Sequence, residues 1–176
     1  RAELRSECGA LVTTFMETFP PLRTAWRPTT ESPRRVGLQR DQIMLHGRFD
    51  LTLGGPSDTT AGRVIIELKT GRPTAQHHDD LRYYGLLETL VTGVPPLMLA
   101  TFYVDAGRVQ TELFNEELLE VAVRRTIDGV TRLAALKAGG AEPRRVPGPP
   151  CRWCPISDDC QPGSAWLEEQ DQAAGW

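Results

Sequence analysis

Two short apolar runs decide the fold: QIMLHGRFDLTL at residues 42–53 and VIIELKT at residues 64–70, with the turn-rich segment GGPSDTTAG at 54–62 between them. Aliphatic and β-branched residues dominate both runs, so the sequence predicts two strands, near 42–53 and 63–70, that pair as a hairpin. Side chains alternate along a strand, and Glu67 and Lys69 therefore point the same way. The run Val64 to Ile66 indicates a central strand covered on both faces, where a carboxylate usually has a partner or a metal.

Asp50, Glu67 and Lys69 suit a metal site built from two carboxylates and one lysine. Two carboxylates can hold a hard divalent cation such as Mg²⁺, with water, a main-chain carbonyl and a substrate phosphate in the remaining positions. Such a cation lowers the pKa of a bound water and polarises a phosphoryl oxygen. A lysine can orient that water or neutralise charge in the transition state. The set favours phosphodiester hydrolysis, whereas an isolated Glu-x-Lys would indicate a solvated strand face and an isolated Asp50 a turn residue.

The wording GRFD…IELKTG, followed by a helix with an aromatic residue in its first turns, resembles the PD-(D/E)XK nuclease superfamily and its RecB-like branch. The resemblance runs from about residue 42 to residue 160. It implies a restriction-endonuclease-like core, in which Asp50, Glu67 and the main-chain carbonyl of Leu68 bind Mg²⁺ or Mn²⁺ and Lys69 is catalytic. It also implies DNA as substrate, either single-stranded or at a duplex end, and partner proteins such as a helicase or a recombination or CRISPR machine.

A Gln-x-x-x-Tyr motif of that branch falls on the stretch from Asp80 to Tyr84. Tyr84 matches the motif, but Asp80 stands where Gln is usual. In a helix His77, Asp80 and Tyr84 lie on one face, at spacings i, i+3 and i+7. Tyr84 can therefore face the substrate and also pack its helix onto the sheet, while His77 is a weaker candidate at the helix start.

The family also places a metal-binding His in an N-terminal helix, and no histidine occurs here before His46. Three alternatives stay open: this ligand is absent, Glu17 replaces it, or the element lies upstream of this chain.

Three cysteines near the C-terminal end form the pattern Cys151-x2-Cys154-x5-Cys160 in a Pro-rich segment that can bury little apolar surface. Such a segment usually needs a metal to fold. Thiolates suit zinc or an iron–sulfur cluster, and both normally take four ligands, which leaves Cys8 as the fourth. The pattern resembles the iron–sulfur staple of AddB-type and CRISPR-associated RecB-like nucleases, which implies a 4Fe-4S cluster, with Zn²⁺ as the alternative.

Cys8 has a second interpretation as a plain core cysteine. It belongs to an apolar set with helical spacing, which predicts a buried stripe: Leu4, Cys8, Leu11, Phe15 and Phe19. Two disulfides would fit poorly with a C-x2-C pair.

Composition limits the class of protein. With 176 residues and 40% hydrophobic content the chain can build one ordinary core, and no stretch nears the roughly twenty apolar residues that span a membrane. We therefore expect one soluble, cytoplasmic nuclease domain over 1–176, with an N-terminal helix and connection at 1–41, a core at 42–138 and a cysteine tail at 139–176. The net charge of −3 argues against coating nucleic acid by bulk charge but not against a nuclease.

The remaining pattern predicts a mixed α/β fold with a central sheet flanked by helices. The predicted elements are a helix to Phe19, an edge strand within 25–36, a helix capped by Thr74 that ends near Val91, strands near 97–105 and 109–114, a helix capped by Asn115 that ends near Ala138, a Pro/Gly-rich linker, and a frayed tail after Trp166. Two other functions stay open: a non-catalytic, metal-stapled DNA-binding or assembly module that keeps the nuclease fold, and a zinc-ribbon protein with an unrelated sheet.

Overall fold

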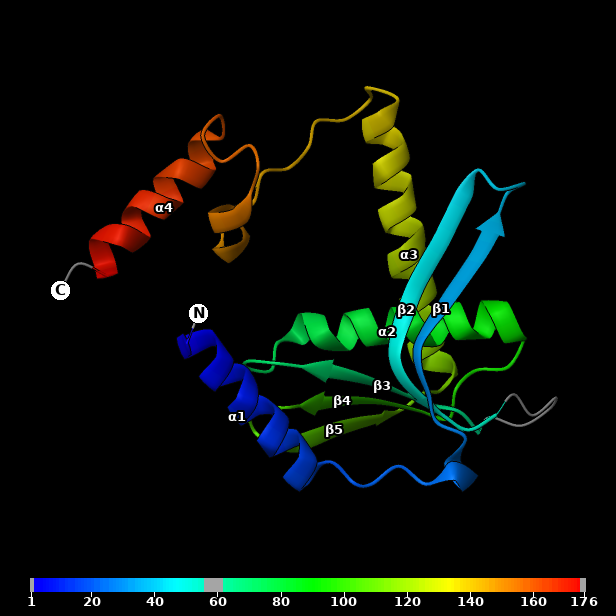
Figure 1. Ribbon diagram of the computed structural model, residues 1–176. Coiled ribbons are helices and arrows are strands. Elements are labelled where there is room, and N and C mark those ends of the chain that lie inside the picture. Colours follow the sequence, from blue (N-terminus) through cyan, green and yellow to red (C-terminus); the bar gives the residue numbers. More distant parts are fainter. Residues whose placement is uncertain (1, 56–61, 175–176) are drawn as a thin grey trace. The chain divides into compact units, whose positions relative to one another are not determined.

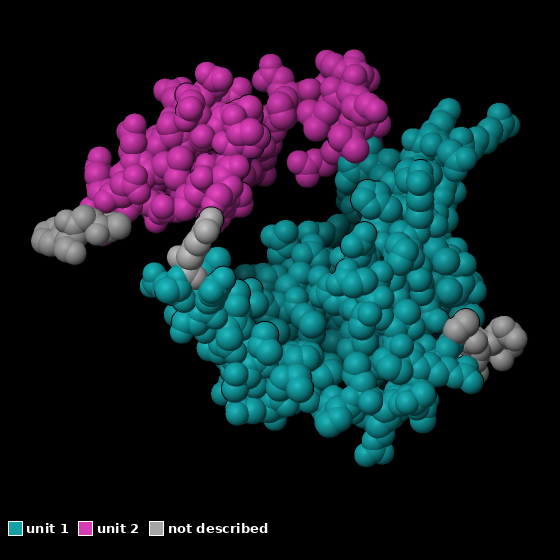
Figure 2. Space-filling model, in the orientation of Figure 1, with its two compact units in different colours: residues 1–130 teal, residues 131–176 magenta. Residues whose placement is uncertain are grey.

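The computed structural model describes residues 2–55 and 62–174, and it divides the chain into two compact units, Arg1–Val130 and Thr131–Trp176 (Figure 2). The boundary falls inside helix α3, Glu116–Lys137, whereas the sequence places the start of the tail at residue 139. The larger unit carries the whole sheet, and the smaller one carries the cysteine trio.

A five-stranded sheet in the order β1-β2-β3-β4-β5 forms the larger unit (Figure 1). Its strands are β1 Thr29–Leu38, β2 Ile43–Leu53, β3 Val64–Lys69, β4 Met98–Tyr103 and β5 Arg108–Leu113. Strands β3 and β4 are parallel, and the other neighbours are antiparallel. This mixed sheet with flanking helices confirms the predicted fold class, and β3 is central as its apolar sequence predicts.

The two faces of the sheet have separate apolar cores. Ile65 belongs to the core that includes Leu81 and Leu87 of helix α2, Ala75–Thr92. Its neighbour Ile66 belongs to the core against helix α1, Ala2–Thr18. Since neighbouring residues of a strand point to opposite faces, α1 and α2 cover opposite sides of the sheet.

Only part of the predicted apolar stripe of α1 reaches its core. Leu11, Phe15 and Phe19 pack there, and the ring centroids of Phe19 and Phe102 lie 4.9 Å apart. By contrast Cys8 is exposed, and Leu4 is 63% exposed. The interpretation of Cys8 as a plain core cysteine is therefore wrong, because Cys8 lies outside the core that Leu11, Phe15 and Phe19 join.

Strands β1 and β2 form a long hairpin arm that leaves the sheet (Figure 1). Strand β2 pairs with β3 only over Leu51–Leu53, while the rest of β2 pairs with β1 alone. Beyond the sheet the arm lies against α2, where Val36, Leu45 and Phe49 belong to or pack on the α2 core. Of the predicted turn at 54–62, residues 56–61 lie outside the described part of the chain.

Helix capping matches the sequence in one of two places. Asn115 Oδ1 accepts a hydrogen bond from the Leu118 amide at 2.9 Å and so caps α3, as predicted. Thr74 is the N-cap residue of α2, but its side chain makes no capping hydrogen bond.

The smaller unit contains the 3-10 turn η2, Pro149–Trp153, and helix α4, Gln161–Ala174. A short 3-10 turn, η1, also precedes β1 in the larger unit at Thr24–Trp26. The prediction of a frayed tail after Trp166 is wrong, because α4 continues through that residue to Ala174. Among the described residues no helix combines the length and apolar character that crossing a membrane requires.

Candidate functional site

The point where the hairpin arm leaves the sheet brings Asp50 beside Glu67. Leu51 lies opposite Ile66 in the antiparallel register, so the preceding Asp50 lies next to Glu67 on the following position of β3. Here the carboxylate of Asp50 replaces a main-chain partner, because Oδ2 accepts a hydrogen bond from the Leu68 amide at 2.8 Å. Strands β2 and β3 diverge at this point, and the side chain of Asp50 therefore points toward β3.

Glu67 offers a free oxygen in a buried position. Glu67 is only 9% exposed, and its Oε1 accepts a hydrogen bond from Lys69 Nζ at 2.9 Å. The other oxygen, Oε2, is buried and has no hydrogen-bond partner among the described residues. Burial raises the pKa of Glu67, and the charge of Asp50 raises it further, against the lowering effect of Lys69. A buried, unpaired carboxylate oxygen is costly without a cation or a donor.

Lys69 is held by the acidic side chains around it. Burial alone would lower its pKa, but the hydrogen bond that Lys69 donates to Glu67 and the charges of Glu67, Asp80 and Asp50 more than compensate and raise the pKa of Lys69. The lysine is therefore a protonated, positively charged donor at neutral pH.

Tyr84 projects from α2 into the same group. Burial raises the pKa of its phenol to about 12, and the carboxylates of Glu67, Asp50 and Asp80 add to the shift. Its ring centroid lies 5.0 Å from that of Phe49. A methyl group added at Gly47 would lie 3.0 Å from Tyr84 Cε1, so the glycine lets the arm approach the tyrosine closely. The GRFD motif therefore supplies both the carboxylate of Asp50 and the packing for Tyr84.

The weaker candidates His77 and Glu17, and the first histidine of the chain, His46, lie elsewhere or have other partners. His77 Nδ1 lies 3.2 Å from the hydroxyl of Tyr103, a contact that accounts for its position without a metal. His46 is exposed on the hairpin arm, and its carbonyl accepts a hydrogen bond from Tyr83. Glu17 is exposed on α1, and α1 covers the face of the sheet opposite to Glu67. The structure does not bring Glu17 to the carboxylate pair.

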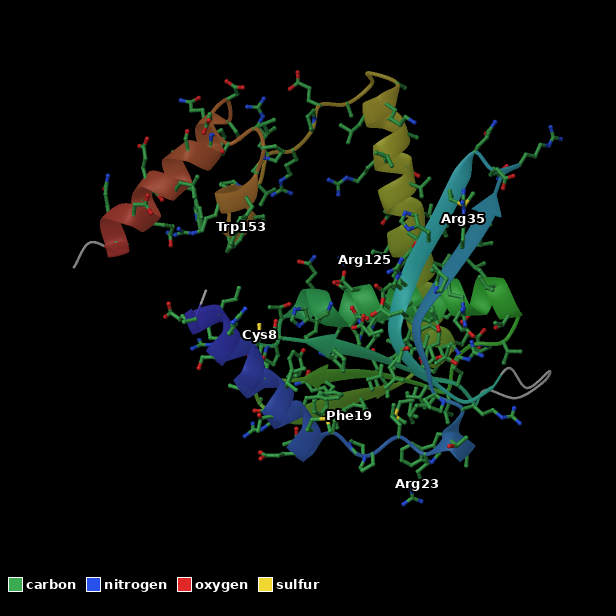
Figure 3. All side chains as sticks on the ribbon, viewed as in Figure 1. Cys8, Phe19, Arg23, Arg35, Arg125 and Trp153 are labelled. Atoms are coloured by element: carbon green, nitrogen blue, oxygen red, sulfur yellow. The ribbon has the colours of Figure 1, made fainter. Side chains whose placement is uncertain are left out.

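In the smaller unit Gly163 lies between two of the cysteines. A methyl group added at this residue would lie 3.4 Å from Cys160 Sγ and 3.6 Å from Cys151 Sγ. The Gly148 amide donates to Cys151 Sγ at 3.4 Å. In the larger unit Cys8 is exposed on α1 (Figure 3).

Within residues 2–55 and 62–174, no three or more His, Cys, Asp or Glu side chains converge in a group that could hold a metal ion. Among the described residues the acidic site thus provides the two carboxylates of Asp50 and Glu67. In the cysteine segment the sulfurs of Cys151 and Cys160 both lie near Gly163.

Sequence reasoning missed one buried ion cluster beside the site. Glu88 of α2 is 2% exposed and accepts hydrogen bonds from Arg34 at 2.8 Å and Arg63 at 2.5 Å. A single glutamate within the apolar run LLETLV could have indicated a buried carboxylate with a cationic partner.

Comparisons with known proteins bear on the family and on the fold. A family model described as the PD-(D/E)XK nuclease superfamily matches residues 1–161. The protein SSO0001 has a crystal structure that superposes with a TM-score of 0.51 at 19% identity, over 90% of this chain and 71% of that one, which supports the fold alone. A crystal structure from Eubacterium rectale described as a "Putative exonuclease" superposes with a TM-score of 0.49 at 13% identity, over 78% of this chain. The match spans 54% of that protein's length. No curated protein matches the sequence significantly.

Proposed function

The chain belongs to the PD-(D/E)XK nuclease superfamily, and from this premise we propose that it is a metal-dependent deoxyribonuclease that hydrolyses phosphodiester bonds. The observation that carries the proposal is the buried Oε2 of Glu67, which has no partner among the described residues and lies beside the carboxylate of Asp50. Oxygen ligands of this kind suit Mg²⁺ or Mn²⁺.

Each residue has a role in this proposal. Asp50 and Glu67 would hold the cation, together with the main-chain carbonyl of Leu68, and the bound cation would supply an acidic water and charge neutralisation at phosphate. Lys69, a protonated donor, would orient the attacking water and stabilise charge on the phosphate. Tyr84, with a pKa raised to about 12, would keep its proton and donate a hydrogen bond to the substrate, with Asp80 near it.

The biological setting is part of the same proposal. The resemblance to RecB-like nucleases supports an exonuclease that acts on single-stranded DNA or on a duplex end, in DNA repair, recombination or CRISPR adaptation. A helicase or another protein of such a machine is the corresponding partner.

The test uses purified protein, Mn²⁺ and end-labelled single- and double-stranded DNA. We expect cleavage by the wild type, and we expect Lys69→Ala and Asp50→Ala to lower the rate by at least about 100-fold, because each removes charge stabilisation that acts in the transition state. Exposed Glu117→Gln on α3 is the matched control and should cleave at the wild-type rate. Cleavage that survives both site substitutions would refute the assignment.

A second candidate function is a non-catalytic DNA-binding or assembly module that keeps the nuclease fold. Asp80 in place of the usual Gln favours it, as does the lack of a third converging ligand among the described residues. Mn²⁺ binding by Asp50 and Glu67 without any turnover of DNA would identify this module.

We further propose that Cys8, Cys151, Cys154 and Cys160 bind a 4Fe-4S cluster, with Zn²⁺ as the alternative. The position of Gly163 between two sulfurs supports the proposal, since a residue without a side chain leaves room beside the thiolates. The amide of Gly148 also supports it, because main-chain donors to sulfur stabilise metal-bound thiolates. The exposure of Cys8 leaves its thiol accessible to a metal.

Metal analysis and absorption spectra of protein purified without oxygen test this second proposal. A cluster predicts brown protein with broad visible absorption and about four iron atoms per chain, lost on Cys154→Ser. Colourless protein with stoichiometric zinc would show that the four cysteines bind Zn²⁺ instead of a cluster. Protein without iron or zinc would refute both assignments.

A further inference from the structure

One buried carboxylate links the three elements that build the acidic site. Glu88 lies on α2, four residues after Tyr84 and thus on the same side of the helix, one turn further on. Its Oε2 accepts from Arg34 Nε on the hairpin arm at 2.8 Å, and its Oε1 accepts from Arg63 Nη1, just before β3, at 2.5 Å. The side chain of Glu88 is only 3% exposed, so solvent screens these pairs little.

The hairpin arm needs such a contact at this position. On the N-terminal side of Leu51 the strand β2 has no main-chain pairing with β3, so the ladder places Asp50 only through its neighbour Leu51 and does not hold the rest of the arm. Side chains of the arm and of α2 hold the arm on the helix there, and the Tyr83 hydroxyl also donates to the main-chain carbonyl of His46. Arg34 is one of them, and its guanidinium also stacks on the ring of Phe49, 5.3 Å from the centroid.

The contacts then continue into the site. Phe49 precedes Asp50, and its ring packs against Tyr84 at 5.0 Å. Asp50 in turn accepts a hydrogen bond from the amide of Leu68, the residue that follows Glu67 in β3. On the other side of Glu88, Arg63 leads directly into the strand that carries Glu67 and Lys69.

We infer that Glu88, clamped between Arg34 and Arg63, is a positioning residue that holds the Asp50 arm in register with β3 and α2. The inference rests on the proposed function in one respect, since the site that it positions is the proposed metal site. Glu88 itself touches neither carboxylate of that site in the structure. It acts through the arm, and the hydrogen bond between Asp50 and the Leu68 amide is the contact that reports on its action.

The experiment measures amide hydrogen exchange by NMR in the full chain without metal or DNA. Glu88→Gln removes the charge and one of the two acceptors. Arg34→Met detaches only the arm, keeps an apolar stem on Phe49 and leaves Glu88 paired with Arg63, so it is the variant to use if Glu88→Gln does not fold. In both we expect the Leu68 amide to exchange at least about tenfold faster relative to the amides of β4, which report on overall stability.

The matched control is Glu112→Gln. Glu112 makes an equally short pair with Arg82, at 2.5 Å, but this pair ties α2 to β5 and leaves the hairpin arm untouched. We expect Glu112→Gln to lower stability without changing the exchange rate of the Leu68 amide relative to the amides of β4. The inference would be overturned if Arg34→Met accelerated exchange equally at Leu68 and in β4, or if Glu112→Gln accelerated exchange selectively at Leu68. Either result would show that the triad of Glu88, Arg34 and Arg63 only stabilises the fold.

A second readout is Mn²⁺ affinity by calorimetry at a temperature where every variant is folded. Substitutions that do not contact a ligand can still weaken its binding about 2- to 30-fold, and we expect a loss of that size for Glu88→Gln and Arg34→Met but not for Glu112→Gln. If the wild type binds no Mn²⁺ and cuts no DNA, the proposed function fails, while the exchange of the Leu68 amide still decides whether Glu88 positions the arm.

Discussion

At the scale of single residues, the site is an acidic group that the fold holds at an energetic cost. Glu67 is buried and lies near Asp50, and both effects raise its pKa. Lys69 offsets part of this cost through its hydrogen bond at 2.9 Å. An arrangement that destabilises ionised carboxylates is typical of a functional site, where a ligand supplies the missing charge.

The raised pKa of Glu67 predicts a pH dependence of stability without metal. Protonated Glu67 contributes to the free energy of unfolding, and this contribution is fully present below pH 4.5, the ordinary pKa of a glutamate. It is lost as the pH rises through the higher pKa of Glu67 in the folded protein. Glu67→Gln cannot ionise, so its stability relative to wild type should increase between pH 4.5 and 7. Urea unfolding in EDTA measures this, with exposed Glu117→Gln as control. Parallel pH profiles of wild type and Glu67→Gln would contradict the prediction.

At the scale of elements, two glycines allow close packing around helix α2, which carries Tyr84. Gly47 on the hairpin arm admits the ring of Tyr84, and Gly85 within α2 admits the ring of Phe114. A methyl group added at Gly85 would lie 2.7 Å from both Cε2 and Cζ of that ring. Neither requirement follows from helix or strand propensity, which disfavours glycine in both places.

Gly85→Ala should therefore lower the free energy of unfolding by about 1–3 kcal/mol, because overpacking outweighs the better helix propensity of alanine. Gly129 in α3 is the matched control, since a methyl group there meets no atom within 4 Å. Gly129→Ala should raise stability by about 0.5–1 kcal/mol. Chemical denaturation of both variants measures the two effects, and a stabilised Gly85→Ala would show that Phe114 moves aside easily.

At the scale of the whole molecule, the two units obtain their stability differently. The larger unit has two apolar cores, one on each face of its sheet. In the smaller unit Trp153 is 79% exposed, Val146 70% and Ile156 61%, so burial contributes less there. We expect a bound metal to supply the difference.

Loss of that metal should therefore affect the smaller unit first. In Cys160→Ser we expect faster amide exchange over residues 148–174 and little change in β3 and β4, as measured by exchange with mass spectrometry. Ser157→Ala, in the same segment but without a thiol, is the control. Unchanged protection of 148–174 in Cys160→Ser would mean that the segment folds without metal.

Local patterns predicted much of this architecture. The apolar runs around Asp50 and Glu67 became β2 and β3, and Asn115 caps α3 as its side chain predicts. The exposure of Cys8 was not predictable, because helical spacing shows which residues share a face but not how far the sheet beneath extends. The triad of Glu88 was not predictable either, since its partners are 54 and 25 residues away in the chain.

The sequence by itself determined which side chains lie together locally: strand alternation alone places Glu67 and Lys69 on one face, and helical spacing alone places Tyr84 one turn after Asp80. Only the tertiary structure decided that these residues form one site. The hairpin arm leaves the sheet at Asp50, and the carboxylate of Asp50 accepts a hydrogen bond from the Leu68 amide. Gly47 makes room for the ring of Tyr84. The physical reason is that periodicity acts over a few neighbouring residues, whereas the direction of an arm follows from packing and buried ion pairs between segments far apart in the chain.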